Sequence, residues 1–113
     1  MTLLTIDQAI AHLREDPGTD VSLYLSAAEQ AAVDFLNRQV YEDADTMAAA
    51  VLAGTAGDDP MVVNDAIKAG ILLILGHLWR NREAVVATPS AVAVEIPMGA
   101  RALLFPYRRG LGV

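Results

Sequence analysis

The side chains most able to do chemistry or to bind a partner lie close together in one stretch, GHLWRNREAVV, at residues 76–86. Histidine and glutamate could exchange protons with a substrate, whereas tryptophan and arginine concentrate binding energy at protein interfaces. Arginine also binds nucleic-acid phosphates. The stretch is therefore a candidate active site, interface or nucleic-acid contact, and five residues carry it: His77, Trp79, Arg80, Arg82 and Glu83.

Signatures of catalysis and metal binding are missing from the sequence. It has no nucleophile elbow, phosphate-binding glycine loop or zinc-protease motif, and its two histidines, His12 and His77, are far apart. The lack of cysteine excludes disulfides and cysteine-ligated zinc. The acidic runs at 42–45 and 58–59 lack the alternating oxygen ligands of a calcium loop, so we interpret them as solvated helix caps. We expect no enzyme, cofactor, metal site or catalytic residue.

Composition favours one domain of closely packed helices over residues 1–113. The chain is 54% hydrophobic but only 5% aromatic, with alanine, leucine and valine dominating. Its longest apolar run, AGILLILG, is about half of the ~20 residues that a membrane span needs. The first residues also lack the basic start of a signal peptide. We expect a soluble protein with no membrane partner.

The charges are divided unevenly along the chain. Residues 1–60 hold eleven acids and two bases, and residues 61–113 hold three acids and six bases, which gives net charges of −9 and +3. This division could serve solubility alone. It could also create two opposite faces that favour head-to-tail self-association. The acidic total argues against sequence-specific binding of DNA, which depends on neutralising phosphates.

Apolar spacing predicts two helices in the first forty residues. Thr5 and Gln8 form a capping-box pattern at the start of a helix over about 6–15. A second helix, capped by Thr19 or Asp20, should run to about Val40, because its apolar residues recur at helical spacing. Its acids, including Glu29 and Asp34, are placed on other faces.

The second half of the chain is expected to hold the longest, central helix. Asp58-Asp59-Pro60 is a strong helix start, and the pattern continues to about Glu83. Gly70 and Gly76 each cost about 1 kcal/mol inside a helix, so we expect close backbone contact with a neighbour as compensation. A last short helix, PMGARALLF, begins at Pro97 and is closed by Pro106.

Three segments are expected to be less regular. Residues 41–59 read as a loop with one short helix over about 47–53, and residues 108–113 as a flexible basic tail. Residues 92–96 alternate in polarity, which predicts a short extended or β segment that must pair with another segment. The expected fold class is mostly α, with about four helices and this extended segment before the last one.

Helix geometry separates the roles within residues 76–86. Trp79 continues the row of Leu72 and Leu75, so its ring should cover the end of the core, while His77 lies at the core edge. Arginines in a last turn also complement the helix dipole. Two interpretations of residues 76–86 therefore remain. In one, Trp79 caps the core and the arginines stabilise the helix dipole; in the other, the stretch is an interface patch. The two interpretations are compatible.

Motifs along nearly the whole chain resemble a known family. They are LTIDQAIAHLRED at the start, VDFLNRQV, DDPMVVNDAIKAGILLILGHLWRNREAVV and VEIPMGARALLFPYR. The most specific feature is the order and spacing of AIKAGILLILGHLWRNREAV and IPMGARALLFPYR. In this combination the chain resembles the small head–tail connector proteins of long-tailed bacteriophages, the adaptors that form a ring beneath the portal. Residues 41–57 match least.

The resemblance implies a mostly helical structural protein of the virion, assembled in the host cytoplasm. Its ring, expected to be dodecameric, would bind the portal on one side and a stopper or head-closure protein on the other, with genomic DNA passing through. Residues assigned to the subunit or portal interface are Trp79, Arg80, Arg82, Glu83, Arg101, Tyr107 and Arg108. Residues assigned to an acidic lumen are Asp34, Glu42, Asp43 and Asp45. The alternatives are a small helical regulatory or DNA-binding module, and an enzyme centred on His77.

Overall fold

The computed structural model describes residues 3–57, 59–81 and 96–109, and this part of the chain is mostly helical, as predicted. Two short strands accompany the helices. The predicted extended segment at 92–96 lies almost wholly outside the described residues. The elements are α1 (Ile6–Leu13), α2 (Ser22–Leu36), β1 (Val40–Tyr41), α3 (Ala44–Ala53), β2 (Met61–Val62), α4 (Asp65–Arg80), α6 (Met98–Leu104) and the 3-10 turn η1 (Phe105–Tyr107).

The predicted capping box starts α1. The Thr5 hydroxyl accepts a hydrogen bond from the Gln8 N–H at 3.1 Å, and the Gln8 side chain accepts one from the Thr5 N–H at 2.9 Å. Before α2, the Asp20 carboxylate accepts hydrogen bonds from the hydroxyl and the N–H of Ser22, and these bonds lower the pKa of Asp20. The predicted capping box of α1 is confirmed, whereas the predicted cap of α2 at Thr19 or Asp20 is wrong, because Val21 is the N-cap and caps the helix with no side-chain hydrogen bond.

The predicted end of α2 at Val40 is wrong. The helix stops at Leu36, because Asn37 adopts a left-handed conformation with φ 55° and its N–H bonds back to the carbonyls of Val33 and Asp34. Val40 is fully buried in β1. Val40 is therefore apolar because it is buried in the strand that follows α2, and not because the helix continues to it.

The predicted start of α4 at Pro60 is also wrong. Met61 and Val62 form β2, and α4 begins at Asp65 after an Asn64 cap, whose side chain accepts a hydrogen bond from the Ile67 N–H at 2.9 Å. The N–H groups of Met61 and Val63 donate instead to the carbonyls of Gln39 and Tyr41, at 3.0 and 2.8 Å. Strand pairing therefore displaces the helix by about one turn.

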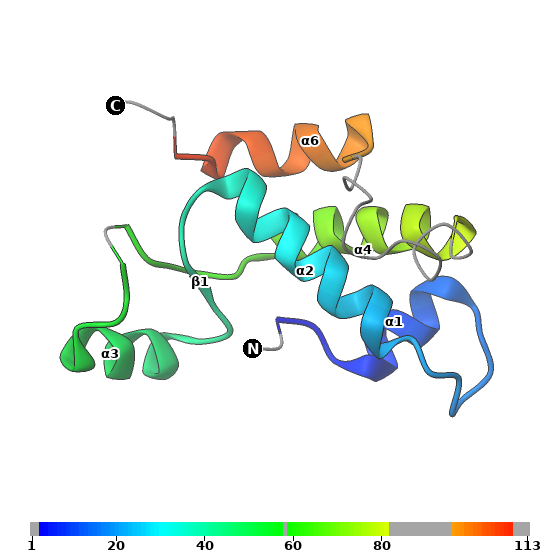
Figure 1. Ribbon diagram of the computed structural model, residues 1–113, viewed down its shortest axis with the longest axis horizontal. Coiled ribbons are helices and arrows are strands. Elements are labelled where there is room, and N and C mark those ends of the chain that lie inside the picture. The colour runs from blue at the N-terminus through cyan, green and yellow to red at the C-terminus, as the bar shows by residue number, and fades with distance from the viewer. Residues whose placement is uncertain (1–2, 58, 82–95, 110–113) are drawn as a thin grey trace.

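The two strands pair in parallel, with Val40 opposite Met61 and Tyr41 opposite Val62. Parallel neighbours need a long crossover, which here contains α3. An Asp43 cap and a left-handed Gly54 bound this helix, which is longer than the one predicted over 47–53. We call β1, α3 and β2 the arm. Figure 1 shows α3 standing apart from the other helices, and α3 contains no buried residue.

The core forms around α4, which lies between α2 and α6 and also contacts α1 (Figure 1). α4 contributes fully buried isoleucines to the core, and its neighbour α2 contributes the small buried residues Ala28 and Ala32, which permit close helix approach. Leu3 and Leu4 complete the core ahead of α1. The largest fully buried side chains are Leu36, Ile67, Ile71, Ile74, Leu75, Leu104, Val21 and Val40.

The two glycines of α4 differ in what surrounds them. A Cβ at Gly70 would lie 2.9 Å from Cγ and Cδ2 of the fully buried Leu104 in α6. A Cβ at Gly76 would meet only the His12 ring nitrogen at 3.7 Å, an ordinary contact. A close approach to a neighbour is therefore found at Gly70, although a leucine side chain and not backbone makes it, and the expectation is wrong at Gly76.

Substituting these glycines should give opposite results. Gly70→Ala should lower the free energy of unfolding by about 1–3 kcal/mol, because the new methyl group overpacks the α4–α6 contact. Gly76→Ala should leave it unchanged or raise it by up to about 1 kcal/mol through better helix propensity. Urea titration of both variants measures the difference. Equal effects would contradict the packing described here.

Candidate assembly surfaces

The predicted role of Trp79 at the end of the core is confirmed. Its ring is half-buried against the core and meets Tyr24 edge-on, with centroids 5.0 Å apart and planes at 88°. Its Nε1 donates a hydrogen bond to the Glu15 carboxylate at 3.0 Å. The residue therefore ties α4 to α2 and to the turn after α1.

The other residues of the opening stretch lie around this tryptophan. His77 is half-buried, and its carbonyl accepts hydrogen bonds from the backbone and the side chain of Asn81. Arg80 is exposed as the last residue of α4, where an interface role remains open to it. Arg82 and Glu83 lie outside the described residues.

The C-terminal basic residues gather at the end of α2. The guanidinium groups of Arg101 and Arg108 lie over the Phe35 ring, at 5.7 and 5.1 Å from its centroid. Arg108 Nε also donates to the Phe35 carbonyl at 2.8 Å, and the Arg109 N–H donates to the Leu36 carbonyl at 2.8 Å. These bonds satisfy the free carbonyls of a helix end, where positive charge is favoured.

Some residues that we predicted to lie in a flexible tail or at an interface make contacts within the molecule instead. Arg108 and Arg109, expected in a flexible tail, are bonded to α2, and residues 110–113 lie outside the described residues. Tyr107 is half-buried and packs against the core. Of the three C-terminal residues assigned to an interface, Arg101 and Arg108 are exposed.

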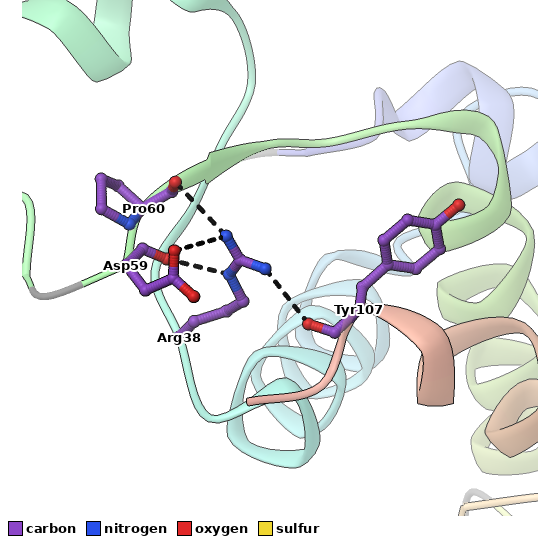
Figure 2. A network of polar contacts seen from close by, with 4 residues as sticks. All are labelled: Arg38, Asp59, Pro60 and Tyr107. Carbon is purple, nitrogen blue, oxygen red and sulfur yellow. Dashed lines mark hydrogen bonds and ion pairs between the residues drawn. The ribbon is translucent and has the colours of Figure 1, made fainter. Parts of the chain in front are cut away.

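Arg38 connects this basic region to the base of the arm, as Figure 2 shows. Its guanidinium donates hydrogen bonds to the carbonyl and the carboxylate of Asp59, at 2.8 and 3.0 Å, and to the Pro60 carbonyl at 3.5 Å. On the other side it donates to the Tyr107 carbonyl at 3.3 Å. One side chain thus sets the position of β2 relative to η1.

An exposed stripe runs along α6 and continues into η1. Met98 and Phe105 are 86% and 65% exposed, although both are large and apolar. Arg101 and Ala102 are also exposed and follow Met98 by three and four residues, so all four share one helix face. The opposite face, with Ala100 and Leu104, is buried. We call the exposed stripe Met98, Arg101, Ala102 and Phe105 the α6 face.

A second exposed stripe runs along α3. Leu52 and Val51 are 90% and 54% exposed, and Ala48 and Asp45 precede Leu52 on the same side. We call Asp45, Ala48, Val51 and Leu52 the α3 face. Exposed apolar groups clustered in this way mark interaction sites more often than ordinary surface does.

The acids assigned to a lumen divide into two places. Glu42, Asp43 and Asp45 surround the exposed start of α3. The Asp43 carboxylate accepts a hydrogen bond from the Thr46 N–H at 2.7 Å, which lowers its pKa and makes it a helix cap. Asp34 lies separately on α2, where its carboxylate accepts a hydrogen bond from Gln30 at 2.8 Å.

Beside Asp34 is an open polar depression of about 280 Å³, lined by Ser26, Glu29, Gln30, Val33, Asp34 and Gln39. Glu29 in its wall is 7% exposed, which corrects its placement outside the core stripe of α2. Its carboxylate accepts hydrogen bonds from the N–H groups of Leu3 and Leu4 at 2.5 and 3.0 Å. Burial raises the pKa of Glu29, although these two bonds oppose the rise. Glu29 follows Leu25 by four residues, a spacing that signals its burial.

The stability contribution of Glu29 should depend on pH. Because its pKa is raised in the fold, this contribution is present below the ordinary value of 4.5 and is lost as pH rises through the folded value. Glu29→Gln keeps an oxygen for Leu3 and Leu4 but does not titrate. Relative to wild type, the variant should therefore gain free energy of unfolding as pH rises from 4 to 7. Denaturant titrations across this range measure the gain, and a constant difference between the proteins would contradict it.

Within the described ranges, Arg38 and Asp59 form the one ion pair, and no three histidine or acidic side chains are grouped so that they could hold a metal ion. No helix in those ranges is long and apolar enough to cross a membrane. The exposed apolar faces on α3 and α6 were not identified from the sequence. Comparison with protein-family models, curated proteins and solved structures finds no match to this chain.

Proposed function

We propose that this protein is a structural subunit of a phage head–tail connector. It assembles into a ring between the portal and a stopper or head-closure protein, and genomic DNA passes through the ring. The observation that carries the proposal is the pair of exposed apolar helix faces, on α3 and α6, carried by a small helical core. The order of the sequence motifs, which resembles that of head–tail connector proteins, is the reason for proposing this family.

The exposed faces support an assembling subunit. Leu52 and Met98 are the most exposed large apolar side chains in the described part of the chain, at 90% and 86%, and each belongs to a cluster of the kind that marks interaction sites. The −9 and +3 halves of the sequence also suit a contact in which one surface meets a different surface of the neighbour. Repeating such a contact closes a ring when the rotation between neighbours divides a full turn evenly, and we expect a dodecameric ring on the portal.

The proposed partners meet different parts of the subunit. We assign the exposed end of α4, at Arg80, and the exposed arginines Arg101 and Arg108 to contacts with a neighbouring subunit or the portal. Asp34, exposed beside the polar depression, is the strongest candidate for an acid that faces DNA in the lumen. An acidic lining repels phosphates, so the genome can slide through without being held. The subunit acts in the virion after assembly in the host cytoplasm.

Co-sedimentation with the cognate portal protein tests this function. The protein should travel with the portal through a density gradient at a fixed ratio, and excess DNA should not displace it. If it stays at the top of the gradient at every ratio tried, the proposal fails. Tight, sequence-dependent retardation of a DNA duplex at low salt would favour the regulatory alternative instead.

A further inference from the structure

The α3 and α6 faces have the same length and a related composition. Each spans eight residues, from Asp45 to Leu52 and from Met98 to Phe105, which corresponds to about 10 Å of helix. Each combines exposed apolar side chains with a charged residue and has an alanine near its middle. Two faces of equal length with small central residues can pack closely along each other.

Their charges are opposite and set a direction. The acids of the arm, Glu42, Asp43 and Asp45, lie at the beginning of α3, and the far end of its face is the apolar Leu52. On α6 the order is reversed, since the face begins with the apolar Met98 and Arg108 follows its end. When the two helices run antiparallel, all three acids come beside the end of the α6 face that Arg108 follows, whereas the parallel order brings only Arg101 near them.

An antiparallel register matches the apolar, small and charged residues of the two faces at the same time. When Leu52 lies opposite Met98, Ala48 lies opposite Ala102, and the acidic start of α3 comes beside Phe105 and the arginines. Apolar ends then cover each other at one side, and small residues meet at the centre. Antiparallel helix dipoles add to the attraction.

The two faces lie apart within one molecule. Figure 1 shows α3 and α6 at separate edges, with α3 joined to the strands and α6 resting on α4. Arg38 holds the base of the arm to η1 and so keeps the two edges in a fixed relation (Figure 2). The α3 face of one copy is therefore available to the α6 face of another.

We propose that the α3 face of one copy binds the α6 face of the next copy in this antiparallel register. The occupant of each face is thus a second copy of this chain. The contact is heterologous, so every subunit uses both faces and the contact repeats around the ring. This inference rests on the proposed connector function, for which it names the subunit contact.

Pairwise disulfide cross-linking tests the contact and its direction. The chain has no cysteine, so single cysteines can be placed without background. Leu52→Cys and Met98→Cys proteins are prepared separately, mixed in equal amounts and mildly oxidised. A disulfide forms readily only when the two Cα atoms lie about 4.4–6.8 Å apart. The 52–98 heterodimer should form, and its yield should fall as salt rises, because exposed charge pairs are screened.

Two matched mixtures control for random collision. Leu52→Cys with Phe105→Cys samples the parallel register, and Leu52→Cys with Leu23→Cys samples an apolar residue of α2 that is 54% exposed and lies in neither face. The 52–98 yield should exceed both by about tenfold or more, the ratio expected for a specific contact of modest strength. All four substituted positions are exposed, so the substitutions leave the core intact.

The outcomes separate this inference from the proposed function. Equal yields in the three mixtures, or no 52–98 product, overturn the α3–α6 contact. If the wild-type protein still co-sediments with the portal in that case, the connector function stands without this contact. A strong 52–98 product without any binding to the portal would instead preserve the contact and reject the connector.

Discussion

Replacing Trp79 with alanine should lower the free energy of unfolding by about 3 kcal/mol or more, the usual cost of removing a large aromatic side chain from a core. The half-buried ring packs against the core and meets Tyr24 edge-on, and its Nε1 donates to Glu15. All three interactions are lost in the variant. Urea unfolding of the purified protein measures the change.

Two neighbouring substitutions make this test specific. Trp79→Phe retains a ring against Tyr24 but loses the hydrogen bond to Glu15, so it should cost about 1–2 kcal/mol. Arg80→Ala, at an exposed position, should stay within about 0.5 kcal/mol of wild type. If Trp79→Ala were as stable as wild type, the ring would have no core role and would serve only at an interface.

Replacing Arg38 with alanine should have the second largest effect, a loss of about 2–3 kcal/mol. Its side chain is 17% exposed and donates to Asp59, Pro60 and Tyr107, so three carbonyls and one carboxylate lose a donor. Hydrogen exchange should also accelerate at the N–H groups of Met61 and Val63, because β2 loses its anchor.

Variants that remove part of the network show which bonds matter. Arg38→Lys should recover less than half of the loss, because one ammonium group cannot reach both Asp59 and Tyr107 as the planar guanidinium does. Asp59→Ala removes only the half-exposed ion pair and should cost less than about 1 kcal/mol. If Asp59→Ala matched Arg38→Ala in urea unfolding, the carbonyl bonds would contribute nothing.

Features encoded within a few residues could be predicted from the sequence. The Thr5 and Gln8 capping box, the helical stripes of α2 and α4 and the position of Trp79 all depend on spacing within one helix. Such patterns carry their own physical signal, since residues three and four apart share a helix face. The mostly helical fold follows from them.

The sheet could not be predicted, because its signal is not local. Strands of two residues have no periodicity, and Val40 pairs with Met61 across the whole of α3. Asp59-Pro60 resembles a helix start equally well whether or not β2 follows. The energy that selects the strands comes from pairing between distant segments, which a single sequence does not display.

The candidate surfaces were missed for a related reason. Leu52, Met98 and Phe105 are apolar residues at helical spacing, the same pattern that marks a core. Only the three-dimensional packing shows that α4 already covers the opposite side of α6 and that, among the described residues, α3 has no buried side chain. Conversely, Glu29 looked like a surface acid and is buried with two N–H donors.

Electron cryo-microscopy of this protein bound to its cognate portal tests the central claim, that it is the repeating subunit of a connector ring, most directly. The account predicts a closed ring on the portal axis with an open channel, in which each α3 face lies antiparallel on the neighbouring α6 face. A portal that carries no additional ring after incubation with saturating protein would contradict it.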